Sequence, residues 1–218
     1  MNASLCMHAA HTDGPKVVEL TTKDIREAAA VLGRGMRDNP LHVRALGSDP
    51  DARQRALTGM FASYLEQILT KGFVLGASSS RTLVGVCAMV EPGRCQPSAG
   101  EKLRLLPGLF RGGSILSTAR VLSWVGRWAR HDPSCEHWHL GPVGVDRDLQ
   151  GRGVGTAMLE VFCSRMDQSR SIAYLETDKS ENVGFYERFG FRVSAQDAVL
   201  GVPNWFMIRD SHERVEQD

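Results

Sequence analysis

The spacing of hydrophobic positions along the chain changes from segment to segment, and each spacing indicates a different element. Between Leu57 and Leu69 apolar side chains recur three and four residues apart, which is typical of an amphipathic helix. Segments 73–77 and 82–90 are rich in β-branched residues and flank a polar turn, so an antiparallel strand pair is predicted. We expect further strands at 16–20, 136–145, 172–177, 191–194 and 204–209. Further helices are expected at 23–37, 154–168 and 182–188. The region 101–130 is expected to be helical in two pieces, with a break near Gly112 and Gly113.

The order of these elements places helices between strands that pair in both antiparallel and parallel fashion. Such an order is typical of the α/β class or of a mixed α+β fold, and 218 residues suit a single domain. We expect this domain to cover 15–212, with a flexible leader at 1–14 and a tail at 213–218.

Composition and charge narrow the function classes. The chain has 26 basic and 25 acidic residues, so it lacks the strongly basic balance of a nucleic-acid or membrane-surface protein. No apolar run is long enough to span a membrane, and residues 1–14 show no secretory signal. The five scattered cysteines predict neither a disulfide framework nor a zinc ribbon, so a cytoplasmic location is expected. They are Cys6, Cys87, Cys95, Cys135 and Cys163.

The most informative segment is the glycine-rich turn 150–156 (QGRGVGT), between a predicted strand and a predicted helix. Its alternating glycines let the backbone approach a ligand closely, and the amides at the helix start favour an anion such as a pyrophosphate. A tight turn without a ligand is the alternative. No lysine follows Gly155 as in a Walker loop, and the spacing GxGxG differs from the Rossmann fingerprint. The pattern that remains is Q-x-x-G-x-G/A.

Two segments together resemble the GNAT superfamily of acyl-CoA-dependent N-acetyltransferases. Residues 140–159 (LGPVGVDRDLQGRGVGTAML) resemble the family's pyrophosphate-binding strand, loop and helix, and residues 185–191 (FYERFGF) resemble its FYExxGF segment. The similarity extends over about residues 15–210. The resemblance implies a mixed central sheet of six to seven strands flanked by helices, with a splayed strand pair at the cofactor. It also implies acetyl-CoA as co-substrate and no metal.

The resemblance further implies which residues contact the cofactor. The backbone of Val143, Gly144 and Val145 would lie along the pantetheine arm, beside a strand irregularity at Gly141 and Pro142. The pyrophosphate would lie against Gln150, Gly151, Arg152, Gly153, Val154, Gly155 and Thr156.

Asn182 departs from the commonest form of the family. That form has asparagine seven residues before the family tyrosine, where this chain has Lys179. Asn182 could therefore contact the cofactor or cap a helix. With the segment 175–177 (LET), this variant resembles the puromycin-acetyltransferase-like branch.

Four residues are candidates for the catalytic chemistry. Tyr186 matches the family tyrosine that protonates the leaving thiolate, although a core tyrosine is the alternative. His137 and His139 alternate on one strand face and are similar to the pair in arylalkylamine acetyltransferases. An imidazole near its ordinary pKa suits a general base, but these histidines could also be zinc ligands, with no third ligand obvious, or ordinary sheet residues. Glu176 is the other candidate for the base or for an ammonium anchor, or a paired carboxylate.

The resulting hypothesis is an acetyl-CoA-dependent N-acetyltransferase in which a primary amine attacks the thioester directly. A small-molecule amine is preferred as acceptor because of the branch resemblance and the helical insertion at 93–130. Two alternatives are acetylation of a protein lysine or N-terminus and a non-catalytic acyl-CoA-binding sensor on the same fold. No nucleic-acid or membrane partner is expected, and the chain is predicted to be a monomer or a homodimer.

Overall fold

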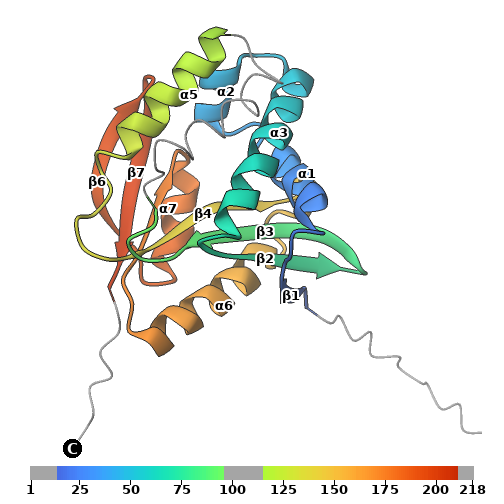
Figure 1. Ribbon diagram of the computed structural model, residues 1–218, viewed down its shortest axis with the longest axis vertical. Helices are drawn as coiled ribbons and strands as arrows, with labels where there is room; N and C mark the ends of the chain where they lie inside the picture. Colours follow the sequence, from blue (N-terminus) through green and yellow to red (C-terminus); the bar gives the residue numbers. More distant parts are fainter. Residues whose placement is uncertain (1–13, 96–114, 211–218) are drawn as a thin grey trace, which may run out of the picture.

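The structure is a computed structural model that describes residues 14–95 and 115–210 (Figure 1). The predicted tail at 213–218, the first part of the 101–130 helical region and the predicted leader apart from Gly14 lie outside the described residues. The strands are β1 (Lys16–Glu19), β2 (Gly72–Ser79), β3 (Thr82–Val90), β4 (Trp138–Val145), β5 (Ala173–Thr177), β6 (Arg192–Val199) and β7 (Val202–Arg209). The helices are α1 (Ile25–Gly35), α2 (Pro40–Leu46), α3 (Pro50–Ile68), α5 (Ile115–Trp128), α6 (Val154–Ser169), α7 (Ser180–Glu187) and the short 3-10 helix η1 (Arg147–Leu149).

The strands form one seven-stranded sheet in the order β1-β2-β3-β4-β5-β7-β6. Only β4 and β5 pair in parallel among these strands, and the other neighbours are antiparallel. Helices cover both faces, so the predicted mixed α/β class with six to seven strands is confirmed.

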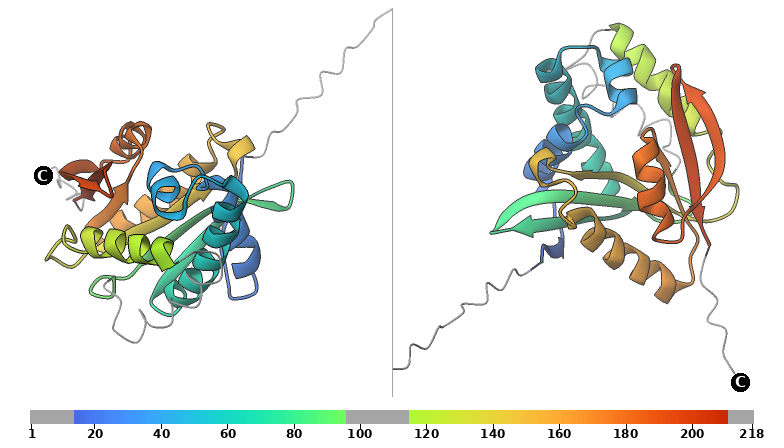
Figure 2. Two further views of the ribbon diagram at one scale, coloured as in Figure 1. Left: turned by 90° about the horizontal axis from the view of Figure 1, so that it is seen from above. Right: turned by 180° about the vertical axis from the view of Figure 1, so that it is seen from behind.

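Helices α1 and α3 lie on one face of the sheet and α6 lies on the other (Figures 1 and 2). Beneath α1 and α3 the core includes Leu32, Leu57 and Val86, and beneath α6 it includes Met158 and Phe162. A third apolar cluster joins α2 to α5 and to the hairpin of β6 and β7. The apolar residues whose spacing predicted the helix at 57–69 therefore lie on the face that α3 buries.

Strands β4 and β5 separate soon after they meet, which is the feature that opens the sheet. Their pairing is limited to Trp138 with Ala173 and His139 with Tyr174. The peptide between Gly141 and Pro142 follows in β4, and the register with β3 shifts at the same level. Proline has no N–H to donate to a sheet ladder, which accounts for the predicted irregularity in β4. The irregularity lies just beyond the last β4–β5 pair, where the two strands splay as predicted.

The end of α1 lies directly against the end of β4. A Cβ atom at Gly35 would stand 2.3 Å from the carbonyl oxygen of Val145, and a Cβ atom at Gly144 would stand 2.8 Å from Leu32. Glycine at these two positions therefore permits the close approach of helix and strand. This contact brings the N-terminal helices to the edge of the opening between β4 and β5.

Several element boundaries differ from the sequence predictions. The pair predicted at 191–194 and 204–209 is a longer hairpin, whose turn places Leu200 and Gly201 at φ of 53° and 80°. The short helix α2 was not predicted, because seven residues show little periodicity. Helix α3 begins at Pro50, before the apolar repeat that starts at Leu57, and Asp49 accepts hydrogen bonds from two backbone N–H groups at its start. Within the described ranges, no helix is long and apolar enough to cross a membrane.

Candidate functional site

A cleft of about 450 Å³ opens where β4 parts from β5. Its walls come from the end of α1, the C-terminal half of β4, the turn before α6, and α7. Ten predicted cofactor-binding residues line it: Val143, Gly144, Val145, Gln150, Gly151, Gly153, Gly155, Thr156, Asn182 and Tyr186. Two do not line it, because Val154 is buried in the core and the Arg152 side chain lies in solvent.

The turn before α6 has the geometry of an anion-binding site. Gly151 and Gly153 adopt φ of 73° and 82°, a conformation that residues with a Cβ rarely adopt. Helix α6 begins immediately afterwards, so the N–H groups of its first turn have no acceptor within the helix. No acidic residue lies in that first turn, while Lys179 and Arg188 also line the cleft. The arrangement can therefore bind an anionic group through backbone amides and the helix dipole.

The side chain of Gln150 connects the three elements around this turn. Its Nε2 donates to the carbonyl oxygens of Gly35 and Val145, each at 3.1 Å. Both amide protons of the glutamine are thereby used within the protein. Gln150 consequently holds the turn against α1 and β4, in addition to lining the cleft.

Two predicted residues of α7 face the cleft from the other side. Tyr186 is 7% exposed and packs edge-on against Phe185 and Phe191. Burial raises the pKa of Tyr186 above its usual range, so its hydroxyl remains a proton donor at neutral pH. Asn182 lies in the first turn of α7 and donates to Thr177 Oγ1 at 3.2 Å. The N-cap of α7 is Lys179, so Asn182 does not cap this helix.

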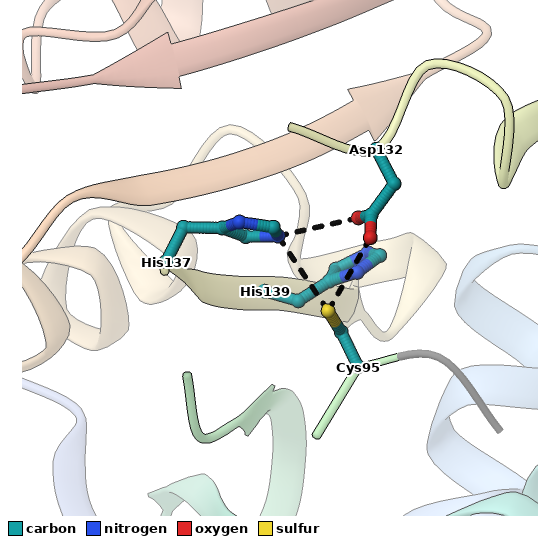
Figure 3. Close-up of side chains that lie close together, drawn as sticks. All are labelled: Cys95, Asp132, His137 and His139. Carbon is teal, nitrogen blue, oxygen red and sulfur yellow. Dashed lines mark hydrogen bonds and ion pairs between the residues drawn. The ribbon is translucent and has the colours of Figure 1, made fainter. Parts of the chain in front are cut away.

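The remaining predicted residues lie at the start of β4 and on β5 (Figure 3). His137 and His139 face the same side, as their alternation predicts, with ring centroids 6.5 Å apart. His139 Nε2 lies 2.9 Å from Glu176 Oε2, so the structure pairs two of the predicted catalytic residues. Glu176 is two residues beyond Tyr174, the last β5 residue paired with β4, and therefore lies where the strands part.

Sequence reasoning missed two residues of this group. Cys95 Sγ lies 3.6 Å from His137 Nε2, and Asp132 Oδ1 lies 3.2 Å from the same nitrogen (Figure 3). Cys95 follows β3 and Asp132 follows α5, so they come from opposite ends of the 96–131 segment. No motif in the sequence links either of them to the histidines, and only the tertiary contact reveals the group.

The short distances change the protonation of these side chains. Hydrogen bonds to His137 and His139 lower the pKa of the Cys95 thiol to about 7. Burial lowers the pKa of His137, but hydrogen bonds to Asp132 and Cys95 outweigh it and raise the pKa to about 10. Burial likewise lowers the pKa of His139, while the charge of Glu176 and the hydrogen bonds raise it to about 10. The ordinary imidazole pKa expected from the sequence is therefore not found.

Comparisons with known proteins give a match to one domain family and to several solved structures. Residues 115–193 match the family model described as the acetyltransferase (GNAT) domain. The chain is similar to a solved structure titled histone acetyltransferase HPA2 and related acetyltransferase, from Corynebacterium glutamicum ATCC 13032. The two are 23% identical over 93% of this chain and 99% of that chain, with a TM-score of 0.69.

Two further solved structures have the same fold. The ribosomal-protein-S18-alanine N-acetyltransferase of Escherichia coli is 12% identical over 94% of this chain and 98% of that chain, with a TM-score of 0.55. A GNAT family acetyltransferase from Brucella melitensis, in complex with acetyl-CoA, is 17% identical over 93% of this chain and 92% of that chain, with a TM-score of 0.50. The chain thus has the fold of these acetyltransferases, as the sequence predicts, and residues 115–193 match the GNAT domain model.

Proposed function

We propose that this protein transfers the acetyl group of acetyl-CoA to a primary amine. The observation that carries the proposal is the cleft at the parting of β4 and β5, which has an anion-binding turn at one end and the buried Tyr186 on α7. A long ligand with a pyrophosphate and a reactive thioester matches both features. The complex of the Brucella melitensis neighbour with acetyl-CoA supports the same ligand.

In this proposal the cofactor binds mainly through backbone groups. The pantetheine arm lies along Val143, Gly144 and Val145, whose pairing with β5 is absent. The pyrophosphate accepts hydrogen bonds from backbone N–H groups of the 150–156 turn and the first turn of α6. Arg152 and Val154 contribute their main chain only, since their side chains do not line the cleft. Asn182 holds the start of α7 beside the cofactor through Thr177.

The proposed reaction is a direct attack of the neutral amine nitrogen on the thioester carbonyl carbon. A C–N bond forms, the C–S bond breaks, and Tyr186 donates its proton to the leaving sulfur. The attacking nitrogen passes a proton through water to Glu176, whose side chain is 4% exposed and lies just beyond the last pair of β4 and β5, outside the cleft lining. His139 orients Glu176 through the 2.9 Å hydrogen bond. His137, two residues earlier on the same face, lies beside His139, with the ring centroids 6.5 Å apart.

We further propose a small-molecule amine as the acceptor. Support comes from the similarity to the puromycin-acetyltransferase-like branch in the 175–186 region. It also comes from α2, which begins directly after the cleft residue Asn39 and has α5 packed against it. The names of two structural neighbours, a histone acetyltransferase and a ribosomal-protein-S18-alanine N-acetyltransferase, refer to protein acceptors, so peptides belong in the same test. A monomer or homodimer, without a nucleic-acid or membrane partner, remains our expectation.

The test measures thiol release from acetyl-CoA with a panel of small amines and peptides, together with acetyl-CoA binding by calorimetry. We expect binding, and turnover with at least one small amine. Tyr186→Phe and Glu176→Gln should each lower kcat by about 10²- to 10⁴-fold, because general acid–base catalysis contributes that much. The acetyl-CoA affinity of Tyr186→Phe should be unchanged. Glu160→Gln, the same substitution at an exposed residue of α6 outside the cleft lining, serves as the matched control for Glu176→Gln.

Each of the following results would contradict one part of the proposal. Absence of acetyl-CoA binding rejects the function as a whole. Binding without turnover for every amine and peptide indicates the acyl-CoA sensor instead. Turnover with peptides alone rejects the small-molecule acceptor, and full activity of Tyr186→Phe rejects this tyrosine as the general acid.

A further inference from the structure

Four side chains with metal-binding atoms converge at the start of β4 (Figure 3). They are Cys95, Asp132, His137 and His139, and one ligand atom from each lies within 4.8 Å of all the others. They come from three separate segments: the chain after β3, the chain after α5, and β4 with the residue before it. His137 is buried and the other three are partly buried, so water competes little for this position.

The distances match the edges of a metal-ligand tetrahedron. Zinc bonds of about 2.0–2.3 Å at tetrahedral angles put neighbouring ligand atoms roughly 3.3–3.8 Å apart. Asp132 Oδ1 lies 3.2 Å from His137 Nε2, and Cys95 Sγ lies 3.6 Å from that nitrogen. The distance from Cys95 Sγ to Asp132 Oδ2 is 3.5 Å. Cys95 Sγ and His137 Nε2 therefore already stand at coordination spacing, and the Asp132 carboxylate stands at that spacing from each of them through a different oxygen.

Both histidines have an outer acceptor that orients the ring. His137 Nδ1 donates to the carbonyl oxygen of Cys135 at 2.8 Å, which directs the Nε2 lone pair toward Cys95 and Asp132. His139 Nε2 lies 2.9 Å from Glu176, which makes Nδ1 the nitrogen available to a metal. Metal-binding histidines almost always donate their second N–H to a carbonyl or carboxylate in this way.

We propose that Cys95, Asp132, His137 and His139 form a zinc site. A thiolate, a carboxylate and two imidazoles are ligands that favour Zn²⁺, and four protein ligands complete a tetrahedron without an open position. The site is therefore structural. It fastens both ends of the 96–131 segment, at Cys95 and Asp132, onto β4. Because the four ligands converge only in the folded chain, zinc binding stabilises the folded state.

This inference does not rest on the proposed function. The zinc site lies at the start of β4, whereas the cleft is lined by the other end of the strand, from Val143 to Val145. Zinc bound to Nδ1 of His139 leaves the Nε2–H on Glu176, so the proposed proton acceptor keeps its partner.

The experiment measures zinc in the untagged, reduced full chain. The protein is stripped with a chelator, reloaded with Zn²⁺, desalted and analysed by atomic emission. We expect about one zinc per chain for the wild type and almost none for Cys95→Ser. Cys135→Ser is the matched control, because this exposed cysteine is adjacent but contributes no ligand side chain. Glu176→Gln should weaken zinc affinity by about 10- to 100-fold through the loss of an outer partner.

A second measurement uses Co²⁺ in place of Zn²⁺. The wild type should show a thiolate-to-cobalt absorption band, and Cys95→Ser should lack it while its circular dichroism and acetyl-CoA binding stay intact. Absence of zinc from the reloaded wild type overturns the proposal. So do equal zinc contents in the wild type and Cys95→Ser, or a cobalt spectrum without the thiolate band. None of these results affects the acetyl-CoA assay, so the two proposals fail separately.

Discussion

His42 is an ionisable residue that the fold holds in the interior. Its ring is 3% exposed and packs against Phe61 and Trp124, with ring centroids at 6.2 Å and 5.3 Å. Nδ1 lies 2.7 Å from the carbonyl oxygen of Met36, which fixes the ring at the start of α2. Burial lowers the pKa of His42 and outweighs the hydrogen bond to Met36, which raises it, while the charges of Asp178 and Arg53 have opposing effects. The folded protein therefore favours the neutral ring.

This burial predicts an acid-dependent loss of stability. Below the ordinary histidine pKa of 6.5 the unfolded chain binds a proton at His42 that the folded chain does not, so unfolding becomes easier as the pH falls. We expect the free energy of unfolding to fall less between pH 7 and pH 5 in His42→Gln than in the wild type, by up to about 2 kcal/mol. Urea unfolding at both pH values measures the difference. Equal losses in the two proteins would contradict the prediction.

At the scale of elements, the turn between β4 and α6 determines whether the cleft can bind an anion. Gly153 is the N-cap of α6 and has a φ of 82° with no atom near the position of a Cβ. A side chain there would fit sterically but would strain the backbone by about 1–3 kcal/mol. The N–H groups that face the cleft depend on this conformation.

Gly153→Ala should therefore weaken acetyl-CoA binding. If the turn relaxes to remove the strain, we expect about 10- to 100-fold lower affinity, measured by calorimetry. Gly201→Ala is the matched control, because Gly201 has a φ of 80° and equally open surroundings in the β6–β7 turn. The control should lose similar stability and keep its affinity. Equal affinities for the two variants would show that the turn does not bind the cofactor.

At the scale of the whole molecule, the cleft joins parts of the chain that are distant in sequence. Gly35 comes from α1, Val143 from β4 and Tyr186 from α7, and all three line the same opening. The ion pair of Arg34 with Asp146, at 2.6 Å, and the hydrogen bonds of Gln150 hold α1 against the end of β4. A ligand in the cleft therefore contacts both the N-terminal helices and the C-terminal half of the fold.

Acetyl-CoA should accordingly stabilise the entire domain against heat. At a free concentration of 100 times its Kd, a ligand that binds only the folded state adds about 2.7 kcal/mol, or roughly 5–10 °C in Tm for a domain of this size. Differential scanning calorimetry measures the shift. Pantetheine, which lacks the pyrophosphate, should produce a smaller one at the same concentration. An unchanged Tm with saturating acetyl-CoA would contradict binding in the cleft.

The sequence by itself was enough to predict features that depend only on residues close together in the chain. The turn 150–156 was predicted because short-range backbone requirements, such as the conformation of Gly153, leave a local pattern of residue types. Tyr186 was predicted from the resemblance of residues 185–191 to the family's FYExxGF segment. Helix faces and most strands were predicted from local patterns as well, since burial of one face imposes a period on the chain. The polar edge strand β6 and the short helix α2 lack such a period, and their bounds were missed.

The grouping of Cys95 and Asp132 with the two histidines required the fold itself. Nothing within a few residues of Cys95 distinguishes it from the other cysteines, and it meets Asp132 only because the chain after β3 and the chain after α5 both reach the start of β4. The same holds for the opening between β4 and β5, where the pairing ends at His139 and Tyr174. Local patterns record what the backbone of one segment demands, whereas side-chain contacts between distant segments depend on how the whole sheet and its helices pack.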